Sequence, residues 1–60
     1  MKVHYFTNEH GMIFAVVKQG RYYEIGVNTD RKTALRDRYI YSFTKGAKTP
    51  REALKRWKEY

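Results

Sequence analysis

Hydrophobic and polar residues alternate along four stretches of this chain, at positions 2–6, 12–18, 21–27 and 38–44. A period of two places successive side chains on opposite faces of an extended strand, and the four stretches are rich in aromatic and β-branched residues. We therefore predict four β-strands. Gln19 and Gly20 separate the second and third stretches, and a two-residue loop that contains glycine favours a tight hairpin.

The loop of this hairpin fixes which residues face one another. With Gln19 and Gly20 in the loop, Val16 is expected opposite Tyr23. One face of the hairpin then collects Met12, Phe14, Val16, Tyr23, Ile25 and Val27. The reverse face carries Ile13, Ala15, Val17, Tyr22, Glu24 and Gly26. We expect the first face to form the core, and we expect the mixed reverse face to be partly covered or to bind something.

Residues 28–37 lack this alternation. Asp30 could cap a short helical turn that runs through Ala34 and Leu35, or the segment could be a long basic loop between strands. We expect a loop with one helical turn. In the last alternating stretch, Tyr39, Tyr41 and Phe43 share one side, while Arg38, Ile40, Ser42 and Thr44 share the other.

The end of the chain carries the signals of a helix start. Thr49 can cap the first turn, Pro50 suits the first helical position, and Glu52 can reach back to the Thr49 amide as a capping box. At 100° per residue, Leu54 and Trp57 lie on an apolar stripe. The opposite side carries Arg51, Lys55 and Lys58. Because so short a helix is marginal alone, its apolar stripe is expected to cover the core face of the sheet.

These elements predict an α+β fold in one small domain, residues 1–60. The expected architecture is an antiparallel meander of three or four strands packed against one C-terminal helix, in the order ββββα.

The net charge of +7 is unevenly distributed along the 60 residues. Residues 1–30 carry three basic and three acidic side chains, whereas residues 31–60 carry ten basic and three acidic ones. The whole excess of positive charge therefore lies in the second half, as expected of a protein that binds a polyanion. No apolar run reaches the roughly 20 residues needed to span a membrane, and no signal peptide is expected, so we predict a cytoplasmic protein without a membrane partner.

The residues that usually carry chemistry are scarce. The chain has no cysteine, which excludes disulfides and thiolate metal sites. A Ser/His pair could be built only from Ser42 with His4 or His10, and the spacing does not suggest one. A metal site from His4, Glu9 and His10 is conceivable, but loop clusters of this kind are common by chance. The glycines are scattered singly and form no phosphate loop. We therefore expect no enzyme, no metal and no cofactor.

Basic residues interleaved with aromatic residues in the second half are typical of a surface that contacts phosphates. The alternation of Phe43 and the position of Trp57 on the apolar stripe indicate packing, so the binding prediction depends on the charges. The expected nucleic-acid-binding residues are Arg31, Lys32, Arg36, Arg38, Lys45, Lys48, Arg51, Lys55, Lys58 and Tyr22. DNA is expected ahead of RNA as the partner.

Three segments in order carry a resemblance: the hairpin at residues 20–23, the basic strand at 38–43, and the helix opening at 48–53. This order resembles the AP2-like amino-terminal domains of phage and transposon integrases. The resemblance implies a three-stranded sheet, backed by one helix, whose exposed face lies in the DNA major groove, and a phage or mobile-element origin. Residues of that face, such as Tyr22 and Arg38, would then meet DNA. The helix opening also resembles the small HicB-like antitoxin fold, in which sheet and helix serve protein contacts.

The alternative is a protein-interaction module, either an inhibitor of a host protein or a homo-oligomer. Its expected surface is the half-apolar reverse face that holds Ile13, Val17 and Tyr22, and the six tyrosines of the chain favour it because tyrosine is enriched in interface cores.

Overall fold

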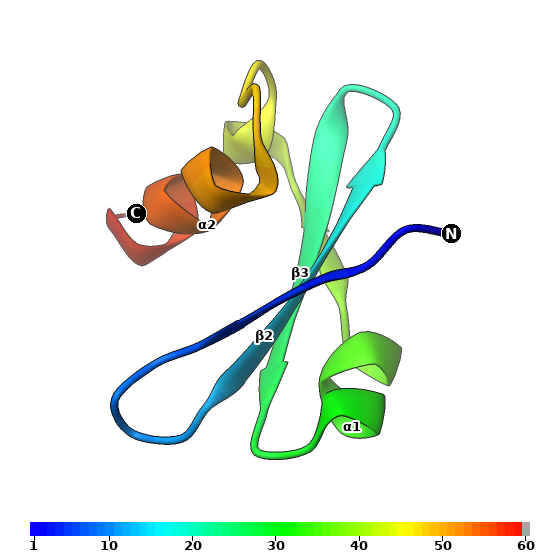
Figure 1. The fold of residues 1–60 in the computed structure, drawn as a ribbon. Coiled ribbons are helices and arrows are strands. Elements are labelled where there is room, and N and C mark those ends of the chain that lie inside the picture. The colour runs from blue at the N-terminus through cyan, green and yellow to red at the C-terminus, as the bar shows by residue number, and fades with distance from the viewer. Residues whose placement is uncertain (60) are drawn as a thin grey trace.

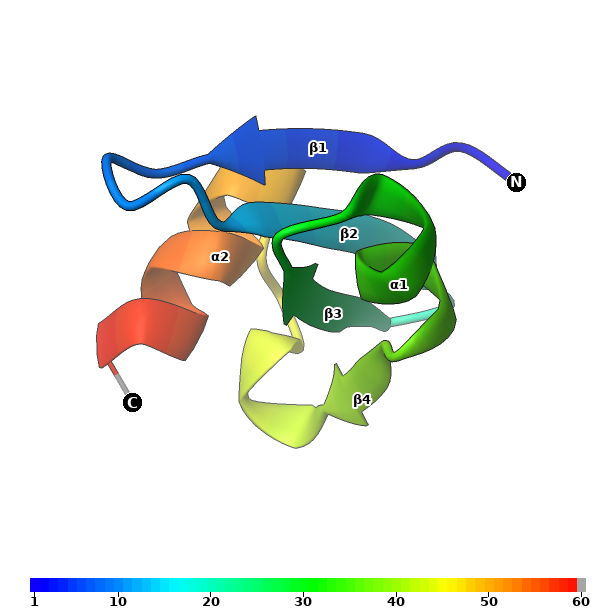
Figure 2. The same ribbon diagram turned by 90° about the horizontal axis from the view of Figure 1, so that it is seen from below.

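The structure, a computed structural model, describes residues 1–59 (Figure 1). Its elements in chain order are β1 (His4–Thr7), β2 (Ile13–Gln19), β3 (Tyr22–Asn28), α1 (Arg31–Arg36), β4 (Tyr39–Tyr41), a 3-10 turn η1 (Ser42–Thr44) and α2 (Pro50–Glu59). The strands form one antiparallel sheet in the order β1-β2-β3-β4, which is the predicted meander (Figure 2). The α+β prediction is confirmed. In addition, α1 packs on one face of the sheet and α2 on the other (Figure 1).

The register of the β2–β3 hairpin differs from the predicted one by two residues. Val16 pairs with Ile25, and Gln19 pairs with Tyr22, so Gly20 and Arg21 form the loop. Gly20 has a φ of 61°, whereas within residues 1–59 no residue other than glycine has a positive φ. Glycine therefore occupies the first position of a type II′ turn, where positive φ is required. Because a shift of two preserves the faces, both predicted faces of the hairpin are retained.

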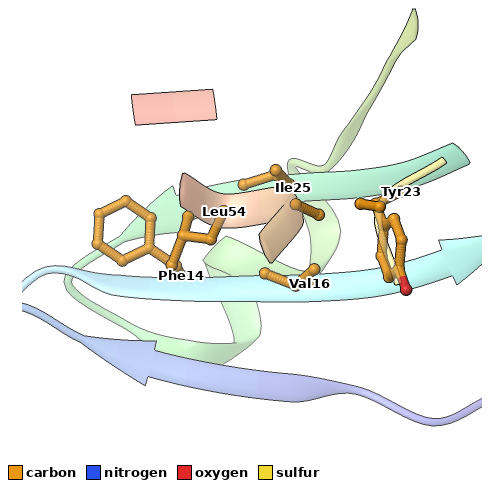
Figure 3. Packing of buried hydrophobic residues seen from close by; sticks show 7 residues of the cluster. Phe14, Val16, Tyr23, Ile25 and Leu54 are labelled. Atoms are coloured by element: carbon orange, nitrogen blue, oxygen red, sulfur yellow. The ribbon is translucent and has the colours of Figure 1, made fainter. Parts of the chain in front are cut away.

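The core lies between the sheet and α2. Figure 3 shows Leu54 of α2 among Phe14, Val16, Tyr23 and Ile25 of the sheet, all of them buried. Trp57 packs against this cluster, with its ring 5.7 Å from that of Phe14 in an edge-to-face arrangement. The predicted core face and the packing role of Trp57 are therefore confirmed.

The reverse face of the hairpin is covered by α1. A Cβ atom at Gly26 would overlap the carbonyl oxygen of Ala34, so the glycine lets the helix backbone approach the sheet. The predicted cap of this helix is present, because the Asp30 carboxylate accepts from the Thr33 backbone N–H at 3.0 Å. The expected single helical turn is thus a six-residue helix. Val17, expected on an accessible surface, is buried.

The last predicted strand is shorter than expected. β4 ends at Tyr41, and residues 42–44 form η1 instead of continuing the strand. The fully buried Thr44 hydroxyl donates to the Tyr41 carbonyl at 2.6 Å and accepts from the Tyr23 backbone N–H at 2.8 Å. The chain leaves the sheet at this point, and the Thr44 hydroxyl supplies the acceptor for the buried Tyr23 N–H.

The predicted start of α2 is confirmed. The Thr49 hydroxyl accepts from the Glu52 N–H at 3.0 Å, and Pro50 is the first helical residue. The return half of the capping box differs by one position, because the Glu52 carboxylate accepts from the Lys48 N–H at 2.9 Å rather than from that of Thr49. Among the described residues, no helix has both the length and the apolar character needed to cross a membrane.

Candidate nucleic-acid interface

The structure divides the ten predicted binding residues between the two helix layers. On the side of α1 lie Arg31, Lys32, Arg36, Arg38 and Tyr22. On the side of α2, or in the loop that leads into it, lie Lys45, Lys48, Arg51, Lys55 and Lys58. The second half of the chain therefore does not form a single basic surface.

Several cations on the α1 side have partners within the protein. The Arg38 guanidinium lies 3.0 Å from the Glu24 carboxylate and donates to the Leu35 carbonyl at 2.8 Å, and its side chain is only 16% exposed. Arg36 lies 3.2 Å from Asp37. The contacts of Arg38 hold the end of α1 against the sheet, and the two ion pairs offset the charges of Arg36 and Arg38.

Acidic residues gather on the same side. Besides Glu24 and Asp37, the N-cap Asp30 belongs to this layer. Hydrogen bonds from the backbone and side chain of Thr33 hold the pKa of Asp30 below its ordinary value of 3.8, so the carboxylate is charged at neutral pH. Three carboxylates thus offset the four cations around α1.

The exposed side of α2 carries a stripe of unpaired cations. The Arg51 guanidinium lies 5.0 Å from the centre of the Phe6 ring, and the Lys58 ammonium lies 5.2 Å from that of Phe14. Cations placed over aromatic faces are held in position and keep their charge. With Lys55, they line a shallow depression beside Leu54 and Glu59, here termed the Leu54 hollow. Within residues 1–59, none of these three cations has an ion-pair partner.

Two further hollows continue this stripe past the start of α2. The first, the Tyr23 hollow, is lined by Met1, Lys2, His4, Val17, Lys18, Gln19, Tyr23, Lys48 and Pro50. The second, the Gly20 hollow, is lined by Lys18, Gly20, Arg21, Lys45, Gly46 and Ala47. The two hollows share Lys18, and Pro50 of the Tyr23 hollow adjoins Arg51 of the Leu54 hollow. Neither hollow has an acidic side chain in its lining.

Arg56 positions the loop that supplies two of these cations. Its guanidinium donates to the Lys45 carbonyl at 2.7 Å and lies 3.5 Å from the Glu52 carboxylate. Glu52 in turn accepts from the Lys48 N–H. These contacts of Glu52 and Arg56, in the first two turns of α2, therefore fix the backbone of residues 45–48 beside the β2–β3 hairpin.

The three hollows together are termed the basic band. Its cations are Lys2, Lys18, Arg21, Lys45, Lys48, Arg51, Lys55 and Lys58, and Glu59 is the acidic residue in its lining. Sequence reasoning missed the first three of these cations, because the first half of the chain has no net charge. Lys18 and Arg21, which flank the predicted loop of Gln19 and Gly20, were the available signal, but their position beside the loop before α2 is a tertiary feature.

Other candidate features are less well assembled. Tyr22 lies with Ile40 and Ser42 around a small depression at the edge of the sheet. His10 lies 3.6 Å from Glu9, and within residues 1–59 no group of three histidine or acidic side chains is arranged to hold a metal ion. The face that the integrase resemblance would place against DNA is the one packed against α1.

Comparison with known proteins gives no relative: no family model, no curated protein and no solved structure matches this chain.

Proposed function

We propose that this protein binds nucleic acid, without catalysis, by contacting the phosphate backbone with the basic band. The observation that carries the proposal is that eight cations line the three hollows of the basic band, and none of them has an ion-pair partner among residues 1–59. Lysine and arginine side chains in this state are free to replace the counterions of a nucleic acid. A cytoplasmic location would give the protein access to such a partner.

The dimensions of the band suit several consecutive phosphates. The molecule measures 28 × 24 × 15 Å, and the ten residues of α2 alone extend about 15 Å. Tyr5 and Phe6 of β1 lie under Arg31 and Arg51, so their ring faces are covered by cations rather than offered to bases. This arrangement favours contact with the backbone over reading of base edges.

The test is a titration of duplex DNA, single-stranded DNA and RNA of equal length, at several salt concentrations from about 50 to 200 mM. For duplex DNA, five to eight phosphate contacts predict a slope of log affinity against log salt between about −4.5 and −7. Binding that is independent of salt, or no binding at about 50 mM, would contradict the proposal. DNA is expected to bind more tightly than RNA.

A second proposal is self-association through β4. This three-residue strand is an edge of the sheet, and its Tyr39 and Ile40 are 69% and 54% exposed. An exposed edge that carries large apolar side chains can pair with the same edge of another copy. Sedimentation velocity of the wild type and of Ile40→Lys tests this proposal. A dimer that Ile40→Lys abolishes supports it, whereas a wild-type monomer at high micromolar concentration contradicts it.

A further inference from the structure

The Tyr23 hollow is the least open of the three hollows in the basic band, and hydrogen-bond donors contribute to its lining. Its volume is about 460 Å³, within the range of small-molecule sites. Lys2, Lys18 and Lys48 line it from three separate parts of the chain, and His4 of β1 also contributes to the lining. Such a lining is complementary to a ligand that has several acceptor oxygens and a negative charge.

Tyr23 supplies an observation that is independent of these surface lysines. The residue is 2% exposed, and its ring belongs to the core. Figure 3 shows the ring extending from β3 toward β2, with the hydroxyl at the tip farthest from Leu54. This hydroxyl has no hydrogen-bond partner among the described residues. Because no fully buried side-chain oxygen of those residues lacks a partner, the hydroxyl retains some contact with solvent, and Tyr23 is among the residues that line the hollow.

The start of α2 brings Lys48 and Pro50 to the hollow but contributes few free N–H groups. Pro50 has none, and the capping box occupies those of Lys48 and Glu52. The Glu52 carboxylate therefore lies near the helix start, bonded to the protein and outside the lining of the hollow. Binding here depends on the side chains of Tyr23 and the three lysines.

We propose that the Tyr23 hollow binds a phosphate monoester, namely the terminal phosphate of a nucleic-acid strand that lies along the basic band. A monoester carries nearly two negative charges and three acceptor oxygens, against one charge for a backbone phosphodiester. The Tyr23 hydroxyl and three ammonium groups match this charge and these acceptors. Since Pro50 adjoins Arg51, a strand that ends in the hollow continues toward Lys55 and Lys58. This assignment rests on the proposed nucleic-acid binding.

The experiment compares single-stranded oligonucleotides of one sequence with a 5′-phosphate, a 3′-phosphate or two hydroxyl ends, by fluorescence anisotropy. One of the two phosphorylated oligonucleotides is expected to bind about tenfold more tightly than the oligonucleotide with two hydroxyl ends. Tyr23→Phe removes only the hydroxyl and is expected to abolish this preference, with the affinity for the hydroxyl form and the unfolding midpoint unchanged. Lys55→Gln, in the band but outside the hollow, is expected to weaken all three oligonucleotides by the same factor.

A parallel titration with a nucleoside 5′-monophosphate, monitored by NMR, tests the Tyr23 hollow separately from the proposed nucleic-acid binding. Shifts at Tyr23 and Lys48 that Tyr23→Phe abolishes, without any oligonucleotide binding, would leave a free-nucleotide site and overturn the assignment to strand ends. Equal affinity for phosphorylated and hydroxyl ends would overturn the inference and leave the basic band as the interface. A preference that Tyr23→Phe retains would also overturn it.

Discussion

Thr44 links three parts of the structure through a single hydroxyl. It is fully buried, and it accepts from the Tyr23 N–H at 2.8 Å across 21 positions of sequence. The same hydroxyl donates to the Tyr41 carbonyl at 2.6 Å. It thereby ends β4, starts the path to α2 and completes the hydrogen bonding of β3.

Replacement of Thr44 by valine should therefore destabilise the protein, although the two side chains have nearly the same size. The side chain keeps its shape, but the buried N–H of Tyr23 loses its acceptor, and we expect the free energy of unfolding to fall by about 1–3 kcal/mol. Urea unfolding measures this change. Thr44→Ser keeps the hydroxyl and serves as the control, so a Val variant that is as stable as the Ser variant would contradict the role assigned to the bond.

At the scale of residues, the sequence pattern predicted the features that depend on neighbouring positions of one strand or one helix. The alternation around Phe14 and Val16 identified the core face, and the helical spacing of Leu54 and Trp57 identified what covers it. Thr44 could not be identified in this way, because its partner is 21 positions away. The hairpin register was wrong for a similar reason, since the sequence shows a glycine in the loop but not which loop position has positive φ.

Among the elements, the two helices differ in how far their own sequence specifies them. α2 has a cap, a proline and an apolar stripe within ten residues, so its start could be predicted. α1 has only six residues, and its formation depends on packing against the sheet at Gly26. The sequence therefore predicted a cap at Asp30 but not a helix that covers the reverse face.

The cap of α1 predicts a local dependence on pH. The pKa of Asp30 is lower in the folded state than its ordinary value of 3.8, because the Thr33 backbone and hydroxyl donate to its carboxylate. The stabilisation is thus complete above pH 3.8 and is lost as the pH falls through the lowered folded-state pKa. NMR of the Thr33 amide from pH 5 to pH 2 measures this loss. In Asp30→Asn, which can cap but cannot titrate, the transition should disappear, and its persistence would show that another group is responsible.

In the whole molecule, the distribution of charge over the surface differs from its distribution along the sequence, where the excess lies in the second half. Five of the eight cations in the basic band come from the predicted set, because α2 and the loop before it are contiguous in sequence. The other three come from β1, β2 and the hairpin loop, or the residues beside them, and only the meander brings them to α2. Conversely, the cations of α1 lie on the other face, among Glu24, Asp30 and Asp37.

The central claim is that the position of the charges, rather than their number, determines nucleic-acid binding. Two variants test it with equal net charge. One replaces the stripe on α2 by glutamine: Arg51→Gln, Lys55→Gln and Lys58→Gln. The other replaces the exposed cations of α1: Arg31→Gln, Lys32→Gln and Arg36→Gln. Each variant loses three charges and one arginine that lies over an aromatic ring of β1.

The deciding measurement is the affinity of these two variants for one DNA duplex across a salt series, with circular dichroism to confirm that both are folded. We predict that the α2 variant loses affinity at least tenfold more than the α1 variant, and that its salt slope becomes shallower by about 2.7, the value for three phosphate contacts. Equal losses would show that net charge alone governs binding. A larger loss in the α1 variant would contradict the assignment of the interface to the basic band.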